Sequence, residues 1–86
     1  MLEDLRKQLD QMNLELIDLI KRRTAIIQQV ALVKKEQNLP IFDPEREEEL
    51  KGKIRSLAEK QGIKGTLLED ILELLIEDSK EEQKRI

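Results

Sequence analysis

The sequence predicts an all-α fold built from three helices, one long and two shorter, in a single small domain. Apolar residues recur every three or four positions along most of the 86 residues, which is the period of helices that bury one side. Pro40, Pro44 and Gly62 fall where the periodic segments break. No internal repeat, low-complexity segment or long linker separates these segments, so we expect one domain over residues 1–86.

The first predicted helix, residues 2–36, organises the rest of the chain. Its apolar seam comprises Leu2, Leu5, Leu9, Met12, Leu16, Leu19, Ile26, Val30 and Val33. At 1.5 Å per residue the helix is about 50 Å long, whereas a compact chain of this size has a radius of gyration of about 12 Å. The helix must therefore extend beyond a monomeric globule. Its exposed seam predicts a second copy of the chain as the partner, in a helical homodimer.

Arg23 occupies a position where this seam calls for an apolar residue. A guanidinium that faces a helical interior is costly unless an anionic group meets it. Lys34 shares a face with Arg23 and lies about 16 Å further along the axis, so the two side chains can hold opposite ends of one small molecule. Arg6 lies about 25 Å from Arg23 and points roughly 100° away, so it can reach that site only from the other chain of an antiparallel dimer.

The second predicted helix covers residues 44–61. Asp43 is a favoured N-cap residue, Pro44 suits the first helical position, and Gly62 is a typical C-terminal glycine. The apolar stripe of this helix is Leu50, Ile54 and Leu57. Glu47 extends that stripe, so we expect it to lie closer to the interior than its acidic neighbours.

The third predicted helix covers residues 67–84 and begins at a capping box, Thr66-Leu67-Leu68-Glu69. Its stripe is Leu68, Leu72, Leu75 and Ile76, continued by Ser79 and Gln83. Two polar residues thus stand where the pattern predicts apolar ones. The tail from Lys80 onward is highly charged and is expected to fray, which would place Gln83 near the edge of order.

The composition narrows the possible chemistry. The chain has no cysteine and no histidine, so a thiolate nucleophile, an imidazole base and the commonest metal ligands are absent. The net charge is −3, the charges are mixed along the helices, and Phe42 is the only aromatic residue, which argues against nucleic-acid binding. No apolar run approaches the length of a membrane span, so we expect no membrane association and a cytoplasmic location.

Polar residues that interrupt the apolar stripes, with their cationic neighbours, form a candidate site. They are Arg6, Arg23, Lys34, Arg46, Glu47, Ser79 and Gln83. Guanidinium groups bind carboxylates bidentately, and lysine and glutamine can donate to an oxygen that gains negative charge. One glutamate among cations suits a hydroxyl donor. The set therefore predicts a site for a small polyanion with a hydroxyl, and any catalysis by positioning and electrostatics, since no nucleophile–base pair is present.

These residues resemble the motifs of the all-helical chorismate mutases over nearly the whole chain. The matching positions are Leu5-Arg6, Arg22-Arg23, Lys34, Pro40-Ile41-Phe42-Asp43-Pro44-Glu45-Arg46-Glu47, and Ile76-Glu77-Asp78-Ser79 followed by Gln83. The patterns D-x-x-R-E and I-E-x-S-x-x-x-Q are specific in combination. The resemblance implies an intertwined homodimer with two equivalent sites. It also implies the rearrangement of chorismate to prephenate, on the route to phenylalanine and tyrosine, without a cofactor, metal or covalent intermediate.

The resemblance further implies how the substrate is held. Arg23 and the partner's Arg6 would bind its two carboxylates. Lys34 and Gln83 would bind the ether oxygen of the breaking bond, and Lys34 would also touch a carboxylate. Lys34, Gln83 and Arg23 would be the catalytic residues, and Arg6 would serve substrate binding.

Other residues of the motifs would complete the site. Glu47 and the backbone near Asp43 would hold the ring hydroxyl, Ser79 would assist at a carboxylate, and Arg46 would support the site. The apolar walls would be Val30, Leu50 and Ile76.

Three alternatives stay open, because a fold does not imply an activity. An isochorismate-pyruvate lyase has the same architecture; Glu47, suited to a ring hydroxyl, favours the mutase, and assays of both substrates distinguish them. A non-catalytic helical dimerisation module would need no polar residues in its stripes and would not bind a dianionic transition-state analogue. The low aromatic content also fits an artificial sequence of this family. Taken singly, each residue has an ordinary explanation; Lys34, for instance, complements the dipole of a helix C-terminus.

Overall fold

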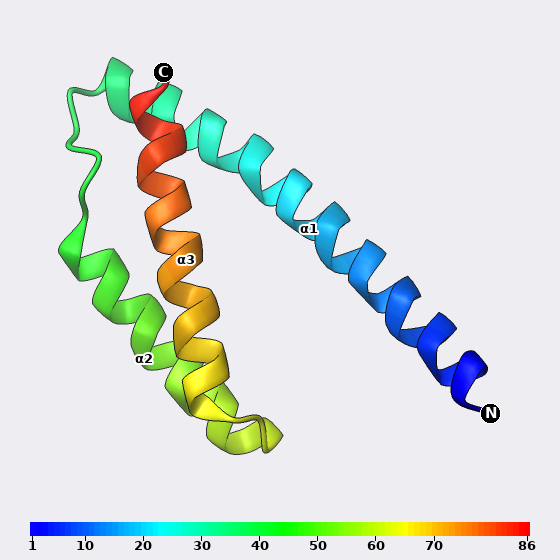
Figure 1. Ribbon diagram of the computed structural model, residues 1–86. Coiled ribbons are helices and arrows are strands. Elements are labelled where there is room, and N and C mark those ends of the chain that lie inside the picture. The colour runs from blue at the N-terminus through cyan, green and yellow to red at the C-terminus, as the bar shows by residue number, and fades with distance from the viewer.

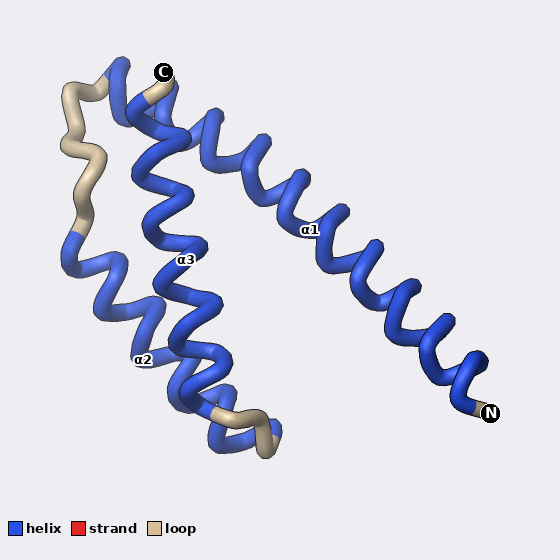
Figure 2. The backbone as a smooth tube through the Cα atoms, in the orientation of Figure 1, coloured by secondary structure: helices blue, strands red, loops and turns tan.

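The computed structural model describes residues 1–86 as three helices joined by short loops, without strands (Figure 1). Helix α1 spans Leu2–Glu36, α2 spans Pro44–Gln61 and α3 spans Gly65–Lys84. Figure 2 shows loop only at the chain ends and in the two connections. The predicted all-α fold of one long and two shorter helices is confirmed. None of the helices is both long and apolar enough to cross a membrane.

The three helices do not form a compact globule. Helix α3 packs against both α1 and α2, while α1 and α2 do not pack on each other. The hairpin of α2 and α3 meets only the C-terminal part of α1, and the N-terminal part projects away from it (Figure 1). The molecule measures 55 × 25 × 15 Å, and its radius of gyration is 15.9 Å. The prediction that the first helix extends beyond the rest of the chain is therefore confirmed.

The apolar core inside the chain is small. Its buried side chains are Ile27, Ala31, Ala58, Leu72 and Ile76. Ile27 and Ala31 thus form the face of α1 that meets α3, whereas every residue of the predicted seam is between 40% and 59% exposed. Helix α1 therefore packs on α3 through the face that carries Ile27 and Ala31, not through the predicted seam. The seam remains as a long apolar surface that nothing in the chain covers.

Local signals set the ends of α2 as the sequence predicts. The side chain of Asp43 caps the helix by accepting a hydrogen bond from the backbone N–H of Arg46 at 3.1 Å. Gly62 ends the helix in the left-handed region, with φ of 65°. The predicted stripe is wrong at one position: Leu57 is half exposed, and Ala58 is buried instead. A small side chain at the contact lets two helices approach closely.

Two expectations for α3 are wrong. The capping box does not form: Lys64 is the N-cap residue without a side-chain cap, because Gly65 and Thr66 already lie inside the helix. The end does not fray at Lys80, since α3 continues to Lys84 and Gln83 is only 8% exposed. The last turns are ordered because they lie beside the C-terminal end of α1 (Figure 1). Otherwise the predicted stripe is correct, with Leu72 and Ile76 buried.

Two glycines of the α2 region give a matched test of backbone energetics. Gly62 has positive φ, and Gly52 lies inside the helix; an added Cβ would meet nothing within 4 Å at either position. Gly62→Ala should therefore lower the free energy of unfolding by about 1 kcal/mol through left-handed strain alone. Gly52→Ala should raise it by about 0.5–1 kcal/mol through helix propensity. Urea unfolding at one protein concentration measures both, and equal effects of the same sign would contradict this account.

Candidate active site

One cavity of about 310 Å³ lies where the C-terminal half of α1, the α1–α2 loop, the start of α2 and the end of α3 meet. Four of its thirteen lining residues come from α1, two from the loop, three from α2 and four from α3. They are Arg23, Ile27, Val30, Lys34, Ile41, Asp43, Arg46, Glu47, Leu50, Ile76, Ser79, Lys80 and Gln83. Residues far apart in the sequence therefore form one polar pocket.

The cavity brings together ten of the eleven predicted site residues. The exception is Arg6, which lies on the projecting part of α1 and pairs with Glu3 at 3.3 Å, exposed to solvent. Three lining residues were not predicted from the sequence. They are Ile27, Ile41 and Lys80. Ile41 belongs to the loop motif Pro40-Ile41-Phe42-Asp43. The sequence pattern did not mark Lys80 as a site residue, except that it lies between Ser79 and Gln83 on the same helix.

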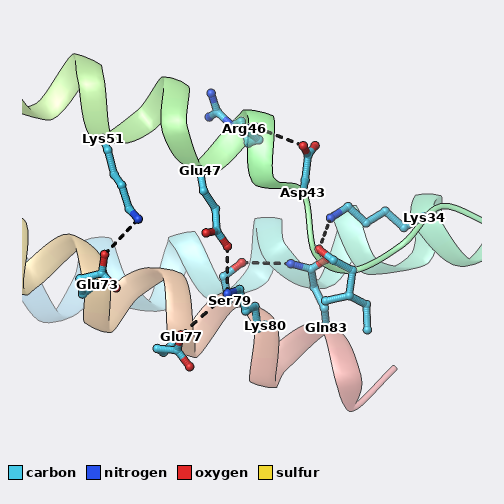
Figure 3. Close-up of polar contacts among 11 residues, drawn as sticks. Lys34, Asp43, Arg46, Glu47, Lys51, Glu73, Glu77, Ser79, Lys80 and Gln83 are labelled. Atoms are coloured by element: carbon cyan, nitrogen blue, oxygen red, sulfur yellow. Dashed lines mark hydrogen bonds and ion pairs between the residues drawn. The ribbon is translucent and has the colours of Figure 1, made fainter.

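Arg23 and Lys34 carry positive charges that no carboxylate of the chain neutralises by direct contact. Arg23 is partly buried, and its Nη1 donates to the carbonyl oxygen of Leu75 at 3.4 Å. Lys34 is also partly buried, and its Nζ donates to the carbonyl oxygen of Ile41 at 2.9 Å, which ties α1 to the loop (Figure 3). A carbonyl orients a cation but does not cancel its charge. Both side chains are therefore suited to bind an anion.

Gln83 is the only buried polar residue of the chain. Its Nε2 donates to the hydroxyl oxygen of Ser79 at 3.1 Å, one helical turn earlier (Figure 3). Its Oε1 is buried without a hydrogen-bond partner. A buried acceptor without a hydrogen bond destabilises the fold by about 1–3 kcal/mol, so such groups are uncommon at positions that serve only packing. The amide is thus held at the cavity with part of its hydrogen-bonding capacity unused.

The start of α2 supplies the carboxylates of the cavity. Asp43 is exposed and its side chain caps the helix, while the guanidinium of Arg46 is exposed and pairs with Glu49 at 3.5 Å. Glu47 is less exposed than its acidic neighbours, as predicted, and its Oε1 lies 3.0 Å from the Nζ of Lys80. Glu47 is therefore the carboxylate that is best shielded in the cavity.

The charge of the cavity differs from that of the whole chain. Its lining includes four cationic side chains and two carboxylates, which leaves a net charge of +2, whereas the chain carries −3. The cationic members are Arg23, Lys34, Arg46 and Lys80. A partly enclosed site concentrates such a field, because charges interact more strongly when water is excluded. The cavity is therefore complementary to a small molecule with two negative charges.

Fold and cavity together define a small all-helical protein with one polar cavity of net positive charge. This chain belongs to the chorismate mutase type II family, whose family model matches residues 5–84.

The chain is similar to curated relatives of two kinds, one of comparable length and two that are much longer. The chorismate mutase of Methanocaldococcus jannaschii is 32% identical over 84 residues, which cover 98% of this chain and 85% of that protein. The T-protein of Haemophilus influenzae is 41% identical over 78 residues, 91% of this chain. A bifunctional chorismate mutase/prephenate dehydratase of Aquifex aeolicus is 38% identical over 56 residues, 65% of this chain. The matches span only 21% and 16% of these last two proteins. No solved structure matches the chain.

Proposed function

We propose that the cavity catalyses the rearrangement of chorismate to prephenate in the biosynthesis of phenylalanine and tyrosine. The observation that carries this proposal is a doubly positive cavity in which Arg23 and Lys34 have no carboxylate partner and Glu47 is shielded. Chorismate is a dianion with one ring hydroxyl, which matches these groups in charge and type. Membership of the chorismate mutase type II family supports the same activity.

Substrate binding would select the reactive shape. Chorismate is flexible and must adopt a compact diaxial form before its bonds can rearrange. Arg23 would hold one carboxylate with help from Ser79, the partner's Arg6 would hold the other, and Glu47 would accept the hydrogen bond of the ring hydroxyl. Holding three points of one molecule removes most of the non-reactive shapes before the chemical step.

The chemical step would then require only electrostatic stabilisation of the charge that develops in the transition state. The ether C–O bond breaks while a C–C bond forms in the same molecule, and the ether oxygen gains partial negative charge. The ammonium of Lys34 has three N–H groups and the amide of Gln83 has two, and one of each is used inside the chain. The others would donate to that oxygen, between apolar walls formed by Val30, Leu50 and Ile76.

We also propose that the protein is a homodimer paired along α1. All residues of α1 before Arg23 are exposed in the single chain, although many are large and apolar. Val30 belongs to this exposed seam and also lines the cavity, so the uncovered surface continues to the site. An antiparallel partner would bury the seam and bring its own Arg6 over the cavity. The cytoplasmic location stays a prediction from the sequence.

The test is an assay of the purified protein with chorismate and, separately, with isochorismate. We expect chorismate to disappear and prephenate to appear in equal amount, and we expect no comparable release of pyruvate from isochorismate. Pyruvate from isochorismate without prephenate formation would indicate the lyase. A protein with no turnover that also fails to bind a dianionic transition-state analogue would be a dimerisation module.

A further inference from the structure

Lys80 lies in the cavity wall, on the turn of α3 between Ser79 and Gln83. Its Nζ lies 3.0 Å from the Oε1 of Glu47 on α2, so the ion pair joins two helices across the cavity (Figure 3). Only 26% of the Lys80 side chain and 19% of the Glu47 side chain are exposed. Most other ion pairs of the chain join exposed side chains within one helix, which sets this one apart.

A second contact fixes the ammonium of Lys80 from the loop side. The Nζ lies 4.7 Å from the centroid of the Phe42 ring, a distance typical of a cation–π interaction. Glu77, on the same helix, lies further from the Nζ, at 3.8 Å. The ammonium is therefore held between the Glu47 carboxylate and the chain's only aromatic ring. Its position depends on α2, α3 and the α1–α2 loop together.

The ion pair determines which carboxylate oxygen of Glu47 remains free. A carboxylate has two oxygens, and the ammonium engages Oε1, which leaves Oε2 to accept a hydrogen bond from a ligand. The hydrogen bond to Glu47 is the main cause that raises the pKa of Lys80 above its ordinary value of 10.5. Lys80 therefore stays protonated and positively charged through the neutral range.

We propose that Lys80 is a positioning residue, which orients Glu47 so that its free oxygen meets the ring hydroxyl of the substrate. This inference rests on the function proposed above. Lys80 acts through Glu47 and need not touch the reacting atoms. It differs in this way from Lys34, which we place at the ether oxygen.

Three variants separate this role from general support of the fold. Lys80→Met removes the charge at similar length, and Lys80→Arg keeps a cation that can pair with Glu47. Lys51→Met is the matched control, because Lys51 also joins α2 to α3, through Glu73 at 3.3 Å, but lies outside the cavity. The substrates are chorismate and an analogue that lacks the ring hydroxyl but keeps the rearranging ether.

We expect Lys80→Met to lower kcat/KM for chorismate by about ten-fold, in the range of coupled neighbouring residues. For the analogue, the same change should have little effect, since no hydroxyl remains for Glu47 to bind. In a Glu47→Ala background, Lys80→Met should have no further effect on chorismate. Lys80→Arg should restore most of the activity, and Lys51→Met should leave it unchanged.

Equal losses of kcat/KM for both substrates would overturn the proposal, because they would mean that Lys80 acts by charge or stability rather than through Glu47. An undiminished loss in the Glu47→Ala background would overturn it too. A wild-type protein that converts no chorismate would instead refute the proposed function and this inference with it. Normal wild-type turnover that Lys80→Met does not change would refute this inference alone.

Discussion

Replacing Lys34 with alanine is expected to lower kcat/KM for chorismate by about 10²- to 10³-fold, while the protein remains folded and dimeric. Removing one preorganised donor to a developing negative charge commonly has an effect of this size. The partly buried ammonium of Lys34 lies at the cavity and keeps two N–H groups after its bond to the Ile41 carbonyl. Arg23→Ala is expected to reduce activity severely as well, through loss of a carboxylate ligand. Steady-state kinetics measures these losses of kcat/KM, and analytical sedimentation checks that the variants remain dimeric.

Lys35→Ala is the matched control for Lys34. The two lysines are adjacent in the last turn of α1, so both complement the helix dipole, but Lys35 is exposed and bonds only to the carbonyl oxygen of Ile86. The control variant should therefore keep normal kinetics. A Lys34→Ala enzyme with near-normal turnover, or a Lys35→Ala enzyme with the same loss, would remove Lys34 from the proposed mechanism.

Arg6→Ala is expected to reduce kcat/KM for chorismate by about 10²-fold or more, a large effect for a residue outside the cavity of its own chain. A charge-assisted bond to a carboxylate contributes more than a neutral hydrogen bond, and its loss leaves one end of the substrate unfixed. Within its chain Arg6 makes only an exposed pair with Glu3, which contributes little to stability. Lys7→Ala, one position away on the same exposed turn, should have little effect. Unchanged kinetics of Arg6→Ala would mean that the site is complete within one chain.

Much of the fold was predictable because its signals are local. Asp43, Pro44 and Gly62 act on their own helix ends, so the boundaries of α2 follow from the sequence. The face of α1 that meets α3 was not predictable in the same way. Apolar residues lie on several sides of α1, including Ile17 and Ile27, and periodicity alone does not say which side meets which partner. The capping box was misleading because Thr66 matches the motif but lies two residues after the N-cap position, which Lys64 occupies.

The site was predictable where a polar residue interrupts an apolar stripe, as Arg23, Ser79 and Gln83 do. Lys80 was missed because it stands at the start of a charged tail, where lysine is ordinary, and its partner Glu47 belongs to another helix. The order of that tail depends on contact between the ends of α1 and α3, which is a tertiary effect. Burial of Gln83 likewise becomes evident only in the folded chain.

The most direct test of the account is a mixture of two inactive variants, Arg6→Ala and Lys34→Ala, unfolded and refolded together in equal amounts. If each site combines the cavity of one chain with the partner's Arg6, a mixed dimer contains one intact site and one doubly defective site. Random pairing makes half of the dimers mixed, so the mixture should regain about a quarter of the wild-type activity. Activity that stays at the level of the separate variants would contradict a site shared between two chains.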